Sequence, residues 1–193
     1  MGHSQADKAR SRQRILATAS RQIREDGLQS LSIARLMKSA NLTHGGFYCH
    51  FANRDVLVTE ALAEALRDGS KSAHKAGGDR SLRAIARSYL SRAHRDIPAN
   101  GCAIASLGGE AARENGDARA VMTAHITRFF EAIEEAVDGH PAAHERALAI
   151  VSMMVGALTL SRVADNAVLS DEILRAARQA ALALGEPGQT PAL

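Results

Sequence analysis

Apolar residues recur at helical spacing along most of this chain. In the first such segment, from about residue 8 to residue 26, the apolar residues fall on one face while arginine and glutamine fill the others. These apolar positions are Ile15, Leu16, Ala19 and Ile23. The pattern predicts an amphipathic helix, and Gly27 directly after it supplies a C-terminal stop.

Three further helices are predicted before residue 75. Ser32 can cap a short helix that ends just before Asn41, a residue that tolerates the left-handed conformation of a tight turn. Thr43 can cap a third helix that runs through His50, and Asn53 can cap a long helix that reaches about residue 72. The helices over about 8–50 therefore form one compact three-helix unit.

The rest of the chain reads as helices separated by glycine, proline and asparagine turns. The clearest turn is at 76–79, and the expected helices span about 81–95, 103–114, 117–138, 142–164 and 170–184. Pro141 suits a first helical turn, and Ser170 suits an N-cap. Tryptophan is absent and aromatic residues are only 3% of the chain, which favours helices over sheets. The predicted fold class is all-α.

Positive charge is concentrated at the N-terminal end. Residues 1–60 hold nine Lys/Arg against five Asp/Glu, a net charge of +4, so the rest of the chain carries −1 of the total of +3. This asymmetry is typical of a polyanion partner for the N-terminal part, although a solvated arginine-rich helix face would give the same balance. Charge alone leaves both readings open.

Several classes of protein are disfavoured by what the sequence lacks. The two cysteines, Cys49 and Cys102, lie far apart and show no metal-ligand spacing, so neither a disulfide framework nor a metal site is expected. No apolar run approaches the roughly 20 residues that span a bilayer. We expect a cytoplasmic protein with reduced thiols and no cofactor.

The segment 32–54 has the pattern of a helix-turn-helix, whose second helix enters the major groove of DNA. It reads Ser-Ile-Ala-Arg-Leu-Met-Lys-Ser-Ala-Asn-Leu-Thr-His-Gly-Gly-Phe-Tyr-Cys-His-Phe-Ala-Asn-Arg, and its ending Phe-Tyr-x-His-Phe before a basic residue resembles the recognition helix of the TetR family of transcriptional regulators. The motif covers about residues 10–60. The resemblance implies an N-terminal three-helix DNA-binding domain (1–52), a larger helical ligand-binding and dimerisation domain (53–185) and a tail (186–193).

The resemblance also implies roles for individual residues. Tyr48, His50 and Arg54 match family positions that contact the phosphate backbone, and all three side chains can donate to phosphate oxygens. Thr43 can offer its hydroxyl to a phosphate. The expected base-contacting positions are His44, Gly45, Gly46 and Cys49, with Arg35 reaching a base or a phosphate. Phe47 and Phe51 are expected in the core instead, because helical spacing places them together on the inner face.

Two residues depart from the family pattern. Asn41 stands where the family usually has glycine, and it can still adopt the turn conformation. Gly45 and Gly46 weaken the recognition helix by on the order of 1 kcal/mol each. Our hypothesis is that they let the backbone approach the bases closely and leave direct reading to His44.

The C-terminal helices at about 142–164 and 170–184 are expected to pair two chains into a homodimer, since their faces are small or apolar; an internal core is the alternative. The residues expected on these faces are Leu148, Val151, Met154, Val155, Leu158, Ile173, Ala177, Ala180 and Leu184. A small-molecule effector is expected among the middle helices. The candidate contacts are Tyr89, His94, Leu107, Met122, Ile126, Phe129, Phe130 and Met153.

Together these features predict a DNA-binding transcriptional regulator, a repressor that a small-molecule effector releases from a palindromic operator. An alternative within the same fold is sensing of electrophiles or oxidants by Cys102, which stands at the start of a helix, where thiolates are favoured. A non-specific DNA-coating protein and an enzyme with a Cys102 nucleophile and a His94 or His125 base are weaker alternatives. Against the enzyme, the sequence shows no third residue at a recognisable spacing that would orient the base.

Overall fold

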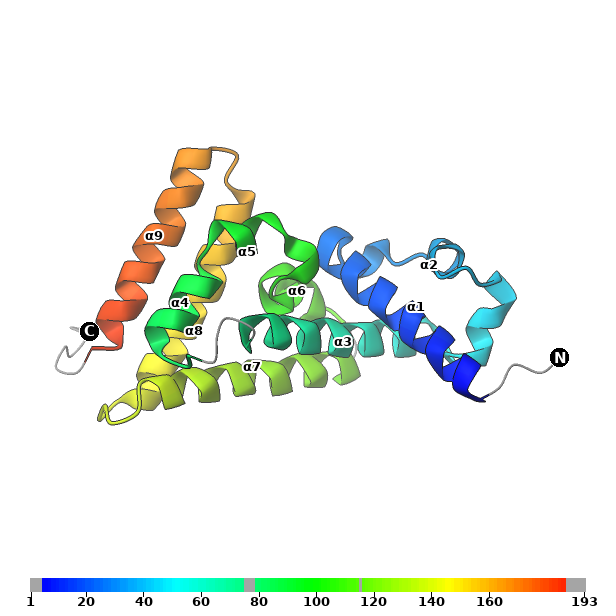
Figure 1. The fold of residues 1–193 in the computed structure, drawn as a ribbon, viewed down its shortest axis with the longest axis horizontal. Coiled ribbons are helices and arrows are strands. Elements are labelled where there is room, and N and C mark those ends of the chain that lie inside the picture. Colours follow the sequence, from blue (N-terminus) through cyan, green and yellow to red (C-terminus); the bar gives the residue numbers. More distant parts are fainter. Residues whose placement is uncertain (1–4, 75–78, 115, 187–193) are drawn as a thin grey trace.

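Figure 1 shows the computed structural model, which describes residues 5–74, 79–114 and 116–186, without the side chains of His44 and 68–74. Its α-helices are α1 (Gln5–Asp26), α2 (Ile33–Ser39), α3 (Arg54–His74), α4 (Leu82–Tyr89), α5 (Arg92–Asp96), α6 (Ala103–Ala111), α7 (Gly116–Ala136), α8 (Ala143–Val163) and α9 (Ala167–Leu184). Short 3-10 helices are η1 (Leu28–Ser30), η2 (His44–Cys49) and η3 (Pro98–Asn100). No strand occurs in these residues, so the all-α prediction is confirmed.

Different helices form the two ends of the molecule. The first two helices form a head at one end, α8 and α9 stand side by side at the other, and α3 and α7 run along the length between them (Figure 1). The predicted turn at 76–78 and the tail from 187 lie outside the described residues.

The N-terminal caps and turns follow the sequence. The Ser32 side chain accepts a hydrogen bond from the backbone N–H of Arg35 at 3.4 Å, and Asn53 Oδ1 accepts one from Val56 at 2.9 Å. Asn41 has φ +57°, the left-handed conformation expected of it, and Gly27 ends α1 with φ +88°. These local predictions are confirmed because each depends on one residue and its nearest backbone.

Two C-terminal predictions were wrong. The helix expected over 81–95 is broken into α4 and α5, because the Ser91 hydroxyl accepts from the backbone N–H of His94 at 3.2 Å and so caps a new helix. The last helix begins at Ala167 instead of after Ser170: the Asn166 side chain caps it, accepting from the backbone N–H groups of Val168 and Leu169. Ser170 is buried inside α9, where its hydroxyl donates to the Ser161 carbonyl at 2.5 Å.

Pro141 also lies outside the helix that it was expected to begin. Residues 141 and 142 form a turn, and α8 starts at Ala143. The end of α8 at Val163 agrees with the prediction to within one residue.

Buried side chains form two hydrophobic cores. The first joins α1, α2, η2 and the first half of α3 to one face of α6 and the start of α7, and includes Leu107 and Met122. The second is built from α4, the end of α7, α8 and α9. Residues on both sides of the predicted domain boundary at 52 and 53 therefore share one core. Helix α6 packs the head against the rest of the described molecule, residues 79–186, which we call the body.

One described helix, α8, is long and apolar enough to cross a membrane by length and composition alone. Its buried face packs in the second core, with Ile150, Met154 and Leu158 almost inaccessible to solvent. The core helix of a globular protein has the same composition, so α8 needs no other explanation.

Candidate DNA-binding surface and candidate effector site

The segment expected to be the recognition helix is the 3-10 helix η2. Thr43 stands at its N-cap position with extended backbone, but its side chain makes no capping hydrogen bond, so that prediction was wrong. The backbone instead closes a 3-10 turn, with Gly46 N donating to Thr43 O at 3.0 Å. Gly45 and Gly46 are poor α-helix formers, which explains why the tighter form prevails in so short a segment.

Aromatic residues anchor η2 to the head. Phe47 and Phe51 are buried and stack with ring centroids 5.6 Å apart, as expected for core residues. Tyr48, by contrast, is 68% exposed, and its ring meets the edge of Phe47 at 5.2 Å. Cys49 is exposed as well. The segment thus has an apolar inner side and a solvent-facing side that carries Tyr48 and Cys49.

Arg12 of α1 holds the end of this segment. Its Nε donates to the His50 carbonyl at 3.3 Å, and its guanidinium lies 4.8 Å from the centre of the Phe51 ring and pairs with Glu60 of α3. Burial, followed by the charges of Lys8 and Arg12, lowers the pKa of His50, so the imidazole is neutral near pH 7. The candidate phosphate contact His50 is therefore a neutral hydrogen-bonding group.

The other candidate DNA contacts around η2 differ in their exposure and in the contacts that they make. Arg54 donates to the Leu28 carbonyl at 3.1 Å, and the largely exposed Arg35 lies 3.8 Å from Asp26. A Cβ built on Gly45 would meet nothing within 4 Å, and one on Gly46 would make only ordinary contacts with Thr43 and Met37. The His44 side chain lies outside the described residues.

A surface hollow of about 640 Å³ lies beside this region, between the start of α1 and the turn after α2. The residues that line it are Asp7, Arg10, Ser11, Gln13, Arg14, Asn41 and Leu42. Its arginines extend the positive charge from α1 toward the turn of the helix-turn-helix.

In the body of the molecule, Tyr89, His94 and Phe129 come together as candidate effector contacts. The Tyr89 ring lies 4.7 Å from the His94 ring and 5.4 Å from the Phe129 ring, measured between centroids. Tyr89 is only 9% exposed, and its hydroxyl is buried with no hydrogen-bond partner among the described residues. Burial raises the pKa of Tyr89 well above its usual range, and the neighbouring Cys102 side chain raises it further.

His94 connects Tyr89 to Cys102 through both ring nitrogens. The backbone N–H of Cys102 donates to Nε2 at 2.8 Å, so Nδ1 carries the proton and donates to the Tyr89 carbonyl at 2.7 Å. Burial, and to a smaller extent the charge of Arg162, lowers the pKa of His94. The ring is therefore held as a neutral donor and acceptor.

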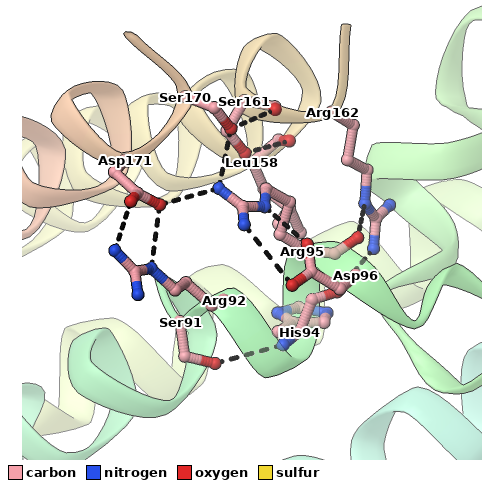
Figure 2. Close-up of polar contacts among 10 residues, drawn as sticks. All are labelled: Ser91, Arg92, His94, Arg95, Asp96, Leu158, Ser161, Arg162, Ser170 and Asp171. Atoms are coloured by element: carbon pink, nitrogen blue, oxygen red, sulfur yellow. Dashed lines mark hydrogen bonds and ion pairs between the residues drawn. The ribbon is translucent and has the colours of Figure 1, made fainter. Parts of the chain in front are cut away.

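Arg162, near the end of α8, completes this cluster and was not among the predicted residues. Its guanidinium donates to the His94 and Arg95 carbonyls at 2.9 Å and 3.2 Å and to the Ser106 hydroxyl at 2.9 Å (Figure 2 shows the first two acceptors). All three acceptors are neutral, and burial lowers the pKa of Arg162. The sequence feature that could have indicated this residue is an arginine near the end of a helix whose second half is otherwise apolar or uncharged.

The remaining candidate effector contacts are divided between the two cores. Leu107 and Met122 are buried in the first core, with Ile126 packed against it, so these three do not join the cluster at Tyr89. Phe130 and Met153 are partly buried against the second core, as is Cys102. Sequence spacing alone could not separate these two groups, because α6 and α7 contribute to both cores.

A network of charged residues joins α5 to α9 beside this cluster. Asp171 accepts from Arg92 and Arg95, and Arg95 also donates to the Ser170 hydroxyl at 2.8 Å (Figure 2). Hydrogen bonds from Arg92 and then Arg95 lower the pKa of Asp171. The network fixes α5, and hence His94, against the body.

Apolar side chains on the outer faces of α8 and α9 are exposed. They are Leu148, Leu160, Val163, Val168 and Leu169, and Val163 is 76% exposed. Four residues expected on the dimer faces, namely Val151, Met154, Leu158 and Ala177, are instead buried in the second core. Of the other predicted residues, Leu148 and Ala180 are exposed, and three are partly buried against the second core, namely Val155, Ile173 and Leu184.

Among the residues that the structure describes, no group of three or more histidine, cysteine and acidic side chains could hold a metal ion.

Residues 15–61 match the family model described as bacterial regulatory proteins, tetR family. These residues therefore carry the N-terminal domain of the tetR family. The matched residues contain η2 and its supports in the head.

Several solved structures share the fold over nearly the whole chain. A TetR-family transcriptional regulator from Cytophaga hutchinsonii has a TM-score of 0.79 at 17% identity, covering 95% of this chain and 98% of its own. E. coli NemR in its reduced form has a TM-score of 0.75 at 18% identity, covering 95% and 100%. A TetR-family regulator from Streptomyces coelicolor has a TM-score of 0.68 at 23% identity, covering 92% and 97%. No curated protein matches the chain in sequence.

Proposed function

We propose that this chain is a transcriptional repressor that binds a palindromic DNA operator as a homodimer and is released by a small-molecule effector. The observation that carries the proposal is the two-sided segment η2: Phe47 fixes it to the head, while Tyr48 and Cys49 face solvent. A phenol and open backbone on an exposed, rigidly held helix are suited to phosphate and base contacts in a major groove.

The dimer is proposed to form through the outer faces of α8 and α9. Exposed apolar side chains such as Leu160, Val163 and Leu169 lie near the connection between these helices, where burial against a second copy would remove them from water. Analytical ultracentrifugation tests the proposal: the parent chain should sediment as a dimer, and Leu160→Glu with Leu169→Glu should give a folded monomer.

DNA binding is tested by selecting duplexes from a random-sequence pool with the full-length dimer. The selected duplex is then compared with a random duplex over a series of salt concentrations. We expect a two-fold symmetric selected sequence and an affinity for it at least about a thousandfold above that for random DNA. Equal affinity for both duplexes, falling in parallel with salt, would indicate a non-specific DNA-coating protein instead.

The glycine hypothesis can be tested in the same assay. A methyl group on Gly46 would meet Thr43 Oγ1 at 3.5 Å and Met37 Cε at 3.6 Å, so Gly46→Ala should fold normally. If the backbone approaches the bases there, the variant binds the selected duplex on the order of tenfold more weakly while its melting temperature is unchanged or higher. Parent-like affinity would contradict the hypothesis.

A second candidate function within the same fold is sensing by Cys102. The thiol lies next to the buried Tyr89 hydroxyl and the Arg162 side chain, in a part of the body that is only partly open to solvent. A thiolate adds to the alkene carbon of N-ethylmaleimide, forming one S–C bond, and the adjacent carbon takes a proton from water. Treated parent dimer should release the selected duplex and Cys102→Ser should retain it; Cys49→Ser is the control for the exposed thiol. Release that is equal in all three would remove this function.

A further inference from the structure

The body contacts the η1 turn of the head through two carboxylates, Glu114, which accepts from the Gln29 side chain at 2.9 Å, and Glu110, which accepts from the backbone. Glu110, at the end of α6, accepts a hydrogen bond from the backbone N–H of Leu28 at 2.8 Å. Leu28 opens η1, the short turn between α1 and α2, and the residue before it, Gly27, has no side chain with which to cap that turn. The Glu110 carboxylate therefore takes the place of a local cap.

Gly27 has a conformation and surroundings that only glycine fits. Its φ is +88°, and a Cβ on it would lie 2.8 Å and 3.0 Å from the two carboxylate oxygens of Glu110. Any side chain at 27 would be strained and would also push the carboxylate away from Leu28. The position of Glu110 thus depends on the glycine that ends α1.

The contact continues from Leu28 to the recognition segment. The Leu28 carbonyl accepts from Arg54, the first residue of α3, at 3.1 Å, and Arg54 follows closely after the buried Phe51. A chain of hydrogen bonds therefore runs from α6 through the η1 turn to the end of the helix-turn-helix. Burial of Leu107 and Ala111 of α6 in the first core attracts the head without fixing its direction, whereas a hydrogen bond to a carboxylate is directional.

We infer that Glu110 is a positioning residue that sets the angle of the head on the body and thereby the spacing of the two DNA half-sites that the dimer accepts. The inference rests on the proposed function. In a dimer the two heads must enter major grooves about one helical turn, roughly 34–36 Å, apart. One added base pair moves a half-site by about 3.4 Å and rotates it about the duplex, so a rigid head angle rejects the wrong spacing.

The test uses the symmetric duplex that the parent dimer selects, and two versions with the half-sites one base pair closer and one base pair farther apart. We expect the parent to lose affinity by on the order of tenfold or more on the altered duplexes, and Glu110→Ala to lose only a few-fold. Glu110→Gln should discriminate like the parent, because its amide oxygen can still accept from Leu28. Glu131→Ala, an exposed carboxylate on α7, is the matched control and should also behave like the parent.

A merely structural role for Glu110 would weaken binding to all three duplexes by the same factor, so the ratio between duplexes is the decisive readout. If Glu110→Ala keeps the parent ratio, this inference is wrong while the proposed function stands. If Glu110→Ala does not fold, Gly27→Ala displaces the carboxylate without removing it and should lower the ratio in the same way. A parent dimer that selects no symmetric duplex overturns both proposals.

Discussion

The head and the body of this protein place their polar groups in opposite ways. In the head, Tyr48 and Cys49 face solvent on a segment fixed by buried phenylalanines, where a partner from outside the chain can reach them. In the body, Tyr89 is buried and His94 and Arg162 are partly buried, and both His94 and Arg162 make hydrogen bonds within the chain. The comparison indicates that the head can bind without rearranging, whereas a molecule entering the body must replace existing contacts.

The largest effect is expected from the anchor of the head. Phe47→Ala removes a fully buried ring that stacks on Phe51, and it should lower the free energy of unfolding by about 3–5 kcal/mol. Chemical denaturation measures this loss. A loss below about 1 kcal/mol would mean that η2 is not held by its apolar side, and the contrast with the body would fail.

Next in size is the effect of Arg162, the partly buried cation of the body. Arg162→Ala leaves the His94 and Arg95 carbonyls and the Ser106 hydroxyl without their donor, so a loss of about 1–3 kcal/mol is expected. Denaturation of the variant is compared with that of Arg128→Ala, whose guanidinium donates only to a carbonyl of its own helix. If both variants lose the same amount, Arg162 does not hold the cluster together.

A smaller, pH-dependent effect is expected from His94. Its pKa is lowered from 6.5 in the folded chain, so below that pH the unfolded chain binds more protons and stability falls as the pH falls. When the pH is lowered from about 7.5 to 5.5, the melting temperature of His94→Gln should therefore fall by less than that of the parent. His144 is the opposite case: Glu134 raises its pKa, so its contribution is lost as pH rises, and His144→Gln should not reduce the acid-induced loss.

The smallest effect on stability is expected from the exposed side of the head. Tyr48→Phe removes a hydroxyl from a side chain that is 68% exposed, so the free energy of unfolding should change by less than about 0.5 kcal/mol. Affinity for the selected duplex should fall by roughly three- to tenfold, since one hydrogen bond to phosphate is lost. Fluorescence anisotropy measures this change, and an unchanged affinity would remove Tyr48 from the DNA contacts.

The accuracy of prediction from the sequence also differs between the head and the body. The helix-turn-helix is a local structure, so Ser32, Asn41 and Asn53 each indicated their own turn or cap correctly. The main error in the head, an α-helix capped by Thr43, arose because two adjacent glycines favour a tighter helix than the family pattern implies.

The body was harder to predict because its site is assembled from residues far apart in sequence. Tyr89, His94 and Phe129 were predicted and do come together, but Arg162 was missed, and Leu107 and Met122 belong to the other core. The break between α4 and α5 explains part of this, since an unbroken helix over 81–95 would not turn the His94 ring back to the Tyr89 carbonyl. No periodicity in the sequence encodes such a reversal.

The 3-10 geometry of η2 also sets the spacing of the side chains along the edge of this segment. A 3-10 helix rises about 2.0 Å per residue against 1.5 Å for an α-helix, and its side chains line up every third residue. Gly45 and Tyr48 therefore share one edge at about 6 Å, close to the stacking distance of two base pairs. Because a Cβ on Gly45 would meet nothing within 4 Å, a side chain installed there would stand on the same edge as Tyr48 without repacking the protein, and it would test whether the backbone at 45 needs to approach a duplex closely.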